Sequence, residues 1–550
     1  MEKKVVIIGS GLGGLSCGVI LARKGFDVTV LEQGTQVGGC LQCFTRKGGK
    51  FETGMHFIGS ASEGQTLDRL LSYLEVKPDI TLSQLDPMGY DTVSLCGQHF
   101  RFANGREAFI DQMSAYFPKQ RDALEKYFNL VDKVASASSM HSLNHVETDV
   151  AVNLEFQMRT INEVIDSTVN DPLLAKVLVG NLPLYAAEKD KTPFATHAFI
   201  MDFYNQSAYR IVGGSDQVAA SLVRTIERYG GRVLTRSKAT KIICDDTHAT
   251  GVEFEDTEVW GRGGSEVRDM SAAEVSSYPR TTVPPYLRYL EADIVISDAH
   301  PMRTLELLDT NLIRPAFRKR INAIPQTVGG FSVYLRFKDN TVPYLNSNFY
   351  GYLQDSPWDC ERYDDASWPK GYLYMHLCYE PQPQFAKTGV VLSYMQMADV
   401  ARWKGTSVGH RGEDYEAFKH EKAERLLAAL ELEFPGLRSN IADYYTSTPL
   451  TYQDYTGTEG GSMYGIAKDV SLGAACRVPH RTRVPNVFQA GQNINSHGIL
   501  GVLVGTIVTC TEIVGPLRLD SEFTVDGLQF TDDNLASRSI PPVEVINCKP

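Results

Sequence analysis

The stretch Val5-Val6-Ile7-Ile8-Gly9-Ser10-Gly11-Leu12-Gly13-Gly14 decides the fold of this 550-residue chain. Its four apolar residues are too few for a helix, and they run directly into a G-x-G-x-x-G turn. Residues 15–24 then carry apolar side chains at helical spacing, and residues 27–31 form an apolar run that ends at Glu32. The sequence therefore predicts a strand, a helix and a second strand, joined as one βαβ unit.

Each part of this unit has a physical role in binding a dinucleotide. Gly9 permits the tight turn, Gly11 lets the backbone approach a diphosphate, and Gly14 allows the helix to pack closely on the strand. The helix N-terminus faces the phosphates, and Glu32 can accept hydrogen bonds from ribose hydroxyls while repelling a 2′-phosphate. The site should prefer FAD or NAD to NADP, with contacts from Gly9, Gly11, Leu12, Gly13, Gly14, Glu32 and Gln33.

Two later segments move the choice from NAD to FAD. They are Val37-Gly38-Gly39 and Phe51-Glu52-Thr53-Gly54-Met55-His56-Phe57-Ile58-Gly59, and neither belongs to a plain NAD domain. The stretch from Val5 to Gly59 resembles the amino-terminal signature of the phytoene desaturase, carotenoid isomerase and retinol saturase family of FAD enzymes. Its ending, residues 56–59, is most similar to the retinol saturase branch. Further matches follow in the family's order at residues 100–118, 209–215, 448–451, 461–465, 484–492 and 497–505.

The resemblance implies an α/β fold, in which a three-layer Rossmann-type FAD-binding domain is interleaved with an α+β substrate domain. We expect residues 1–84, 205–304 and 476–520 to form the FAD-binding domain, and residues 85–204 and 305–475 the substrate domain. Residues 521–550 are expected to be a C-terminal tail, and the polar stretch between residues 255 and 291 a surface insertion of unknown purpose.

The resemblance also implies the rest of the flavin site. A helix from about Val502 to Val514 would direct its positive end at flavin N1 and the C2 carbonyl, and so stabilise the anionic reduced flavin. Ala239 would contact the adenine through its backbone. The implied contacts beyond the first turn are Gly38, Gly39, Gly54, Met55, His56, Ala239, Gly491, Gln492, Gly501 and Val502.

Saturating a carbon–carbon double bond needs a hydride on one carbon and a proton on the other, so an acid must lie near the flavin. His56 is the first candidate because it follows the expected Gly54 contact. His197 and Tyr464 complete the predicted catalytic set, with His497, Tyr204 and Tyr209 as further candidates. For each of them the alternative is an ordinary core side chain with a hydrogen-bonded polar tip.

Composition excludes several classes of function. The net charge is −12, and no long basic run is present, which argues against a nucleic-acid partner. No uninterrupted apolar run reaches about 18 residues. The ten cysteines are scattered, which suits a reducing compartment. We therefore expect a cytoplasmic chain, with peripheral membrane contact suggested by the substrate class.

The Cys40-Leu41-Gln42-Cys43 sequence has two interpretations, an ordinary pair of thiols or a thiol couple with the flavin. A structural zinc site would need a second such pair at suitable spacing, and none exists, so no metal is predicted. The chain also has no second G-x-G-x-x-G module for NAD(P)H. We therefore expect an electron-donor protein or a transiently bound donor.

These observations predict an FAD-dependent oxidoreductase that acts on carbon–carbon double bonds of a lipophilic, conjugated, retinoid- or carotenoid-like substrate. The segment from Glu52 to Gly59 favours reduction by a saturase. A desaturase or an isomerase could use the same flavin site. An amine oxidase-like enzyme and a non-catalytic lipid or prenyl-protein carrier remain as alternatives.

Overall fold

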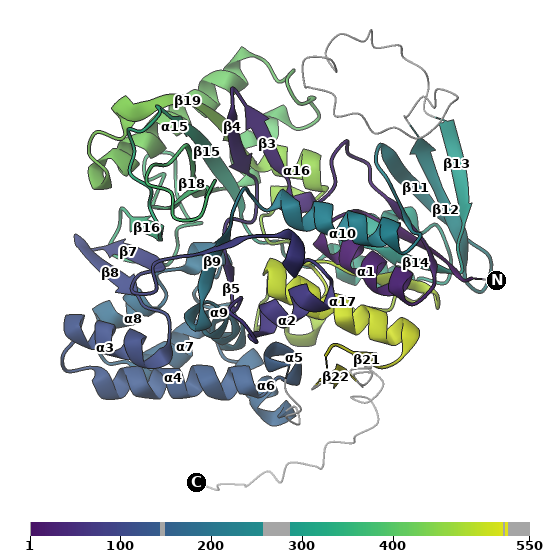
Figure 1. Ribbon diagram of the computed structural model, residues 1–550, viewed down its shortest axis with the longest axis horizontal. Helices are drawn as coiled ribbons and strands as arrows, with labels where there is room; N and C mark the ends of the chain where they lie inside the picture. Colours follow the sequence, from purple (N-terminus) through teal and green to yellow (C-terminus); the bar gives the residue numbers. More distant parts are fainter. Residues whose placement is uncertain (1, 144–148, 257–285, 521–522, 526–550) are drawn as a thin grey trace, which may run out of the picture.

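The structure is a computed structural model, and it describes residues 2–143, 149–256, 286–520 and 523–525 (Figure 1). Its first sheet is parallel, with the strand order β10-β2-β1-β14-β20. Val5 of β1 pairs with Val28 of β2 on one side and with Ile294 of β14 on the other. The apolar run 5–8 is buried throughout, as a central parallel strand requires. The strands are β1 (Lys4–Ile8), β2 (Asp27–Leu31), β10 (Arg232–Leu234), β14 (Ile294–Ser297) and β20 (Val487–Gln489).

Three helices cover one face of this sheet and an antiparallel meander covers the other. Alternate residues of β1 show the division, since Val5 and Ile7 join the core under the helices while Val6 and Ile8 join the core under the meander. The helices are α1 (Leu12–Arg23), α10 (Asp216–Arg228) and α17 (Gly498–Val514). The meander consists of β11 (Ser237–Cys244), β12 (Ala249–Asp256) and β13 (Tyr286–Glu291). This is the predicted three-layer Rossmann-type domain.

The second large sheet has seven strands in the order β19-β15-β18-β17-β16-β7-β8. It is antiparallel except where β16 pairs with β7 in parallel. Helix α15 (Glu413–Glu433) contributes to the core on one face, and a layer of helices packs on the other. The strands are β7 (Asp91–Leu95), β8 (Gln98–Phe102), β15 (Gly329–Phe337), β16 (Asn348–Tyr352), β17 (Gly371–His376), β18 (Thr388–Met395) and β19 (Ile441–Ser447).

The helical layer is formed by residues between β8 and β9, and Figure 1 shows it at the opposite end of the molecule from β11–β13. Four of these helices begin at a residue whose side chain caps the first turn, and Thr160 with Glu163 forms a reciprocal capping box for α7. They are α3 (Arg106–Tyr116), α4 (Arg121–Ser136), α5 (Ser139–Ser142), α6 (Val150–Gln157), α7 (Ile161–Thr168), α8 (Pro172–Leu178) and α9 (Phe194–Gln206).

Short elements connect the two sheets. A hairpin is formed by β3 (Cys43–Arg46) and β4 (Gly49–Glu52), and a small sheet by β5 (Ile58–Gly59), β6 (Leu82–Gln84) and β9 (Ala208–Ile211). The remaining α-helices are α2 (Thr66–Tyr73), α12 (Pro301–Leu307), α13 (Pro315–Asn322), α14 (Met397–Val400) and α16 (Pro449–Thr456). Turns of 3-10 helix occur at η1 (Gly39–Leu41), η2 (Lys77–Asp79), η3 (Leu182–Leu184), η4 (Ala401–Trp403), η5 (Arg438–Asn440), η6 (Glu459–Gly461) and η7 (Gly473–Cys476).

The fold class agrees with the prediction, and two boundaries differ from it. Helix α17 begins at Gly498, earlier than the expected Val502. The expected tail from residue 521 contains a strand, β22 (Thr524–Val525), which pairs with β21 (Leu517–Arg518), and Phe523 and Val525 are buried. Most of the expected insertion between residues 255 and 291 lies outside the described residues. No helix in the described ranges has the length and apolar content that a bilayer span requires.

Candidate cofactor and active site

The two glycine segments from opposite ends of the chain meet at the N-terminus of α1. A Cβ added to Gly13 would lie 2.6 Å from the backbone nitrogen of Gly491, and one added to Gly14 would lie 2.2 Å from the carbonyl oxygen of Gly9. Gly9 itself has a φ of 96°, which side chains rarely tolerate. No side chain caps α1, and its first turn contains no acidic residue. The first amide groups of α1 are therefore available to an anion.

The carboxylate of Asp298 lies in this glycine cradle. Asp298 follows β14, and the backbone amides of Gly14 and Gly11 act to lower the pKa of its carboxyl group. A Cβ on Gly11 would lie 2.4 Å from Oδ2, and one on Gly491 would lie 2.4 Å from Oδ1. Burial raises the pKa of Asp298 to about 7, against the opposing effect of the amides. The uncapped first turn of α1 and the close approach that its glycines allow fit a diphosphate, and the Asp298 carboxyl group lies in that space.

Glu32 lies at the end of β2, beside the same turn. Its Oε2 accepts hydrogen bonds from Ser10 N at 3.1 Å and from Ser10 Oγ at 2.5 Å, and its Oε1 accepts one from Gly34 N at 2.7 Å. Backbone pairing continues from Glu32 into the meander, because Ser237 N donates to the Glu32 carbonyl at 2.7 Å. Ala239 follows on β11, at a shift in register, and is partly buried.

The remaining residues predicted to contact the cofactor differ in exposure. The Gly38-Gly39 pair closes over the first turn, since Gly38 N donates to Ser10 O at 2.9 Å and a Cβ on Gly39 would lie 3.3 Å from Gly11 Cα. Leu12 and Met55 are partly buried, whereas Gln33 is exposed. A Cβ on Gly54 would lie 2.9 Å from the Cys40 carbonyl oxygen.

The second anion-binding end is the start of α17. The strand β20 leads through Gly491 and Gln492 to His497, the N-cap residue, whose side chain makes no capping hydrogen bond. The first turn of α17 again contains no acidic residue. A Cβ on Gly501 would lie 2.7 Å from Ser496 Cβ, and Val502 is buried. Helix α17 packs on α1 (Figure 1).

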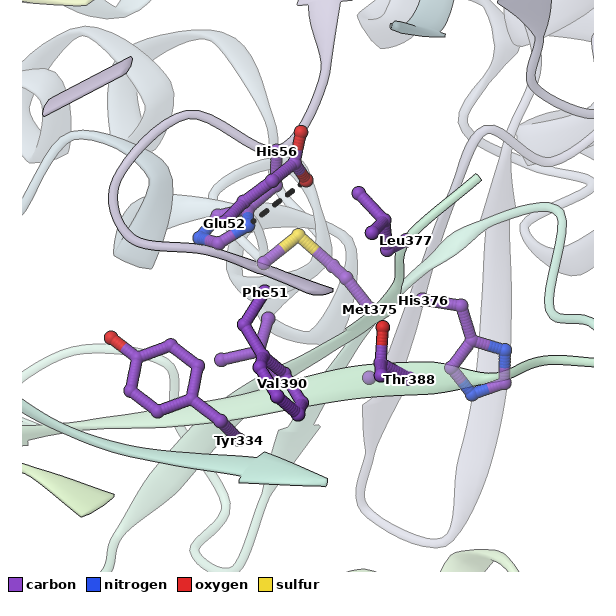
Figure 2. Close-up of a pocket in the computed structure, with 10 residues that line it drawn as sticks. Phe51, Glu52, His56, Tyr334, Met375, His376, Leu377, Thr388 and Val390 are labelled. Carbon is purple, nitrogen blue, oxygen red and sulfur yellow. Dashed lines mark ion pairs between the residues drawn. The ribbon is translucent and has the colours of Figure 1, made fainter. Parts of the chain in front are cut away.

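His56 lines a small pocket of about 10 Å³ between β4 and the seven-stranded sheet (Figure 2). Its Nδ1 is 3.5 Å from Oε2 of Glu52, whose Oε1 accepts a hydrogen bond from Ser215 N at 3.0 Å. The His56 carbonyl oxygen accepts a hydrogen bond from Arg210 Nη1 at 3.2 Å. Glu52 and Arg210 therefore hold both the ring and the backbone of His56. The apolar pocket wall includes Phe51, Tyr334, Met375, Leu377 and Val390.

Tyr464 and His497 form an aromatic pair, with ring centroids 4.9 Å apart. The Tyr464 hydroxyl donates a hydrogen bond to the Pro183 carbonyl oxygen at 2.9 Å. Burial raises the pKa of Tyr464, and burial together with the charge of Lys468 lowers the pKa of His497 to about 4. The Tyr464 hydroxyl is therefore anchored to the helical layer, while Nε2 of His497 is buried without a hydrogen-bond partner.

The structure corrects the interpretation of His197 as a catalytic residue. His197 is fully buried between α4 and α9, and both of its ring nitrogens are occupied: Nε2 by the Tyr127 hydroxyl and Nδ1 by the Tyr185 hydroxyl, each at 2.7 Å. Burial lowers its pKa to about 3, so it is neutral. His197 is a structural link within the helical layer, because it has no ring nitrogen left to contact a substrate.

The other tyrosine and cysteine candidates from the sequence are engaged in contacts within the protein or are buried. Tyr204 packs on Phe57 with ring centroids 4.8 Å apart, and the Tyr209 hydroxyl lies 2.9 Å from Ser62 Oγ. Cys40 and Cys43 are free thiols, and burial raises their pKa values to about 11 and about 12. Both are therefore protonated thiols at neutral pH, the form that is a poor nucleophile.

Two further residues at the site were missed by sequence reasoning. Asp298 could have been found, because it ends the strand that was expected to return to the cofactor. Lys468 carries no such signal, since it lies in a loop segment between two glycine motifs. Only the folded chain brings its ammonium close enough to lower the pKa of His497.

Comparison with known proteins agrees with this arrangement. A family model described as an NAD(P)-binding Rossmann-like domain matches residues 7–74. The chain is 28% identical over 562 residues to all-trans-retinol 13,14-reductase of Rattus norvegicus, covering 92% of this chain and 85% of that protein. It is 20% identical over 549 residues to prolycopene isomerase 1, chloroplastic, of an Oncidium hybrid cultivar, covering 95% and 86%.

Solved structures agree on the fold. A triple mutant of putrescine oxidase superposes with a TM-score of 0.60 at 15% identity, covering 93% of this chain and 99% of that one. At this identity the likeness concerns the fold alone. Together with the glycine cradle, these matches support a flavin oxidoreductase that is similar along nearly its whole length to all-trans-retinol 13,14-reductases and to prolycopene isomerases.

Proposed function

We propose that this chain binds FAD between α1 and α17 and reduces a carbon–carbon double bond of a lipophilic, retinoid-like polyene. The observation that carries the proposal is the meeting of Gly13 with Gly491, which brings the N-terminus of α1 against the segment that leads into α17. Similarity to retinol reductases along nearly the whole chain supports the reaction and the substrate class.

Different residues would bind different parts of FAD. The amides of the first turn of α1 would bind the diphosphate, and Glu32 would exchange its bonds to Ser10 for the ribose hydroxyls. The N-terminus of α17 would face the pyrimidine edge of the ring. Bound FAD supplies hydride transfer, which no amino-acid side chain can provide.

His56 is the group that we propose to deliver the proton. Its Nδ1 faces Glu52, so that carboxylate fixes the orientation of the ring. No hydrogen bond of Nε2 occurs among the described residues, which leaves this nitrogen to face a substrate. The Tyr464 hydroxyl already donates a hydrogen bond to the Pro183 carbonyl oxygen. Tyr464 would therefore position the polyene and leave proton delivery to His56.

The proposed lipophilic substrate suggests that the protein contacts a membrane. On α6, Val150 and Leu154 are exposed on one side of the helix, and Met158 continues that side just after it. We propose that this apolar face rests on a membrane surface. Replacing all three by serine should abolish flotation with phosphatidylcholine vesicles, and flotation that persists would contradict the contact. The electron donor is proposed to be a separate protein or a transiently bound molecule.

The test of the function is a single turnover with the purified holoprotein. Reduced anaerobically and mixed with all-trans-retinol, it should reoxidise its flavin and form a dihydro product, detected by loss of polyene absorbance and by mass. His56→Asn should bind FAD normally but slow this step by about 10²–10⁴-fold, the usual contribution of a general acid. His248→Asn, which alters an exposed histidine paired with Asp245, is the control and should be unaffected.

A second candidate is an isomerase that uses reduced flavin without net turnover, and similarity to a prolycopene isomerase favours it. The same mixing experiment separates the two. An unchanged mass with an altered isomer pattern supports the isomerase, and flavin that stays reduced beside unchanged retinol removes retinol as the substrate. Protein that neither contains nor takes up flavin would instead favour the non-catalytic carrier.

A further inference from the structure

Three buried polar groups lie without a hydrogen-bond partner where the seven-stranded sheet meets the helical layer. They are the hydroxyls of Tyr90 and Tyr350 and the carboxyl oxygen Oδ2 of Asp91, and in the part of the chain that the structure describes none of them is hydrogen-bonded. All three side chains are fully shielded from solvent. An unpaired buried polar group destabilises the folded protein, so native structures contain few of them, and a cluster of three points to a ligand.

The register of the sheet places Tyr350 beside Asp91. Asp91 of β7 pairs with Asn348 of β16, and Asn348 Nδ2 donates a hydrogen bond to Asp91 Oδ1 at 2.8 Å. Tyr350 follows Asn348 by two residues and therefore points to the same face of the sheet. It joins the core under the helical layer, whereas Phe349 joins the core under α15. Burial and the nearby charge of Asp91 raise the pKa of Tyr350. Because Asn348 occupies Oδ1, the oxygen left for a further donor is Oδ2.

A chain of hydrogen bonds connects this pair to His56. The Asn348 side chain that donates to Asp91 also accepts a hydrogen bond, from Arg210 Nη2 to Oδ1 at 3.0 Å. The other terminal nitrogen of Arg210, Nη1, donates to the His56 carbonyl oxygen at 3.2 Å. Two side chains therefore separate Asp91 from His56, and the distances along the chain are those of ordinary hydrogen bonds.

Apolar side chains cover the face of the sheet between Tyr350 and the pocket at His56. Leu373 of β17 pairs with Tyr350, and Met375, two residues further along the same strand, lines the pocket (Figure 2). Val390 of β18 pairs with Met375 and lines the pocket as well. The pocket is too small for a polyene, so the side chains over this face must move when a substrate enters. A polyene on this face would rest on carbon along its length and meet polar groups at one end.

We propose that Tyr350 and Asp91 bind the hydroxyl group at the end of a conjugated alcohol. The Tyr350 hydroxyl donates to the substrate oxygen, and Asp91 Oδ2 accepts the hydrogen of the substrate hydroxyl. The inference rests on the proposed function, because it takes a polyene as the occupant, and it narrows the substrate class to alcohols. A hydrocarbon polyene would leave both groups unpaired, which is how a site built for a hydroxyl rejects an analogue that lacks it.

Binding to the oxidised holoprotein tests the inference without turnover. Two ligands are compared, all-trans-retinol and its deoxy analogue, in which a methyl group replaces the CH2OH group. Their dissociation constants are measured by quenching of tryptophan fluorescence. Tyr350→Phe should change the ratio of the two constants about tenfold in favour of the deoxy analogue, the usual effect of one lost hydrogen bond. Comparing this ratio between wild type and variant cancels the difference in hydrophobicity between the ligands.

Stability distinguishes a hydroxyl kept for a ligand from one that supports the fold. Tyr350→Phe should not lower the melting temperature of the ligand-free holoprotein, because it removes a buried hydroxyl that has no protein partner. Tyr352→Phe is the matched control, two residues further along the same strand and on the same face. The Tyr352 hydroxyl donates to the Gly180 carbonyl oxygen at 2.7 Å, so this variant should lower the melting temperature and keep the wild-type ratio.

Asp91→Asn is the second variant if the phenylalanine variant does not fold. Its amide oxygen must still accept the hydrogen bond from Asn348, so its NH2 group takes the place of Oδ2 and cannot accept the substrate hydrogen. This variant should shift the ratio in the same direction as Tyr350→Phe.

An unchanged ratio in folded, FAD-loaded Tyr350→Phe and Asp91→Asn would overturn the inference. Equal kcat/KM for retinol and the deoxy analogue in the wild-type protein would also overturn it, and would leave the proposed function intact. Flavin that stays reduced in the presence of both polyenes would instead refute the proposed function.

Discussion

At the scale of single residues, Asp298 has the largest consequence for cofactor binding. Its carboxyl group lies beside Gly11 and Gly14, where a diphosphate would bind. The ionisable groups that face it are Glu32 at the end of β2, Cys17 on α1 and Cys40 on η1. None of them is a cation, so the ionised carboxylate and a diphosphate repel each other without compensation. FAD must therefore displace Asp298 or bind its protonated form.

This competition predicts that FAD binding weakens as pH rises. Burial raises the pKa of Asp298 to about 7, so below this pH the carboxyl is protonated and above it FAD binds against a charge. For one linked proton, the dissociation constant should rise by up to about tenfold per pH unit above 7. Asp298→Asn should bind FAD more tightly at pH 8.5 and remove most of the slope, as measured by quenching of FAD fluorescence.

Asp91 supplies the control for this experiment. Burial also raises its pKa to about 7, but it lies on β7 in the seven-stranded sheet, where it accepts a hydrogen bond from Asn348 Nδ2 at 2.8 Å. Asp91→Asn should leave the pH dependence of FAD binding unchanged. A slope that survives in Asp298→Asn would show that another group controls it.

The residue scale also marks how far sequence reasoning reaches. The position of Glu32 beside the first turn could be predicted, because it follows from spacing within one βαβ unit. His197 could not be interpreted correctly, because Tyr127 and Tyr185 come from different segments and meet its ring only in the fold. Asp298 and Lys468 act across similarly long separations, and no local pattern reports such contacts.

At the scale of elements, the junction between β1 and α1 determines whether the cofactor site forms. Gly14 lies in the first turn of α1, and a Cβ added to it would lie 2.2 Å from the Gly9 carbonyl oxygen. That contact is with backbone, which cannot move aside as a flexible side chain can. The start of α1 is therefore fixed relative to β1 by the absence of a single methyl group.

Gly14→Ala should consequently abolish stable FAD binding, because α1 must move away from β1 and its amides lose their common direction. The expected dissociation constant is at least 100-fold higher, as measured by equilibrium dialysis. Gly505→Ala is the matched helical substitution, since its Cβ would meet only Asn495 Cβ at 3.4 Å. It should retain FAD and stabilise α17 by up to about 1 kcal/mol. Normal binding by Gly14→Ala would contradict the packing argument.

Elements were predictable where one periodic pattern covers them. The βαβ unit is such a case, and β1, α1 and β2 occupy the expected residues. The start of α17 was placed too late, at Val502, because Gly498 and Gly501 suggest a turn when read locally. In the structure Gly501 lies inside the helix, where it packs closely against Ser496. Tertiary contact therefore overrides the low helix propensity of glycine.

At the scale of the whole molecule, the parallel sheet is completed by strands from three distant parts of the chain. The strands β1 and β2 come from the first part, β10 and β14 from the middle, and β20 from the last. The interleaving could be expected only from the family resemblance, since no local signal relates β14 to β20. The parallel pairing of β16 with β7 had no sequence signal at all.

FAD should link these parts energetically. A ligand that binds only the assembled site stabilises the folded protein by about 4 kcal/mol when the free ligand concentration is 1,000 times the dissociation constant. Adding FAD to the apoprotein should slow hydrogen exchange at residues 11–15 and 498–502 with the same concentration dependence. Residues 390–394 of β18 should change little and serve as the internal control. Different midpoints for the two glycine segments would show that they bind separately.

The contact between Gly13 and Gly491 also has a consequence for biosynthesis. At about 5–20 residues per second, the ribosome delivers α17 roughly 25–100 s after α1. Throughout that interval the nascent chain has only half of its flavin site, and Asp298 can occupy the glycine cradle once β14 has emerged. Chains that stall before α17 would therefore remain without flavin, so the yellow colour of a preparation would report how many chains were translated through to this helix.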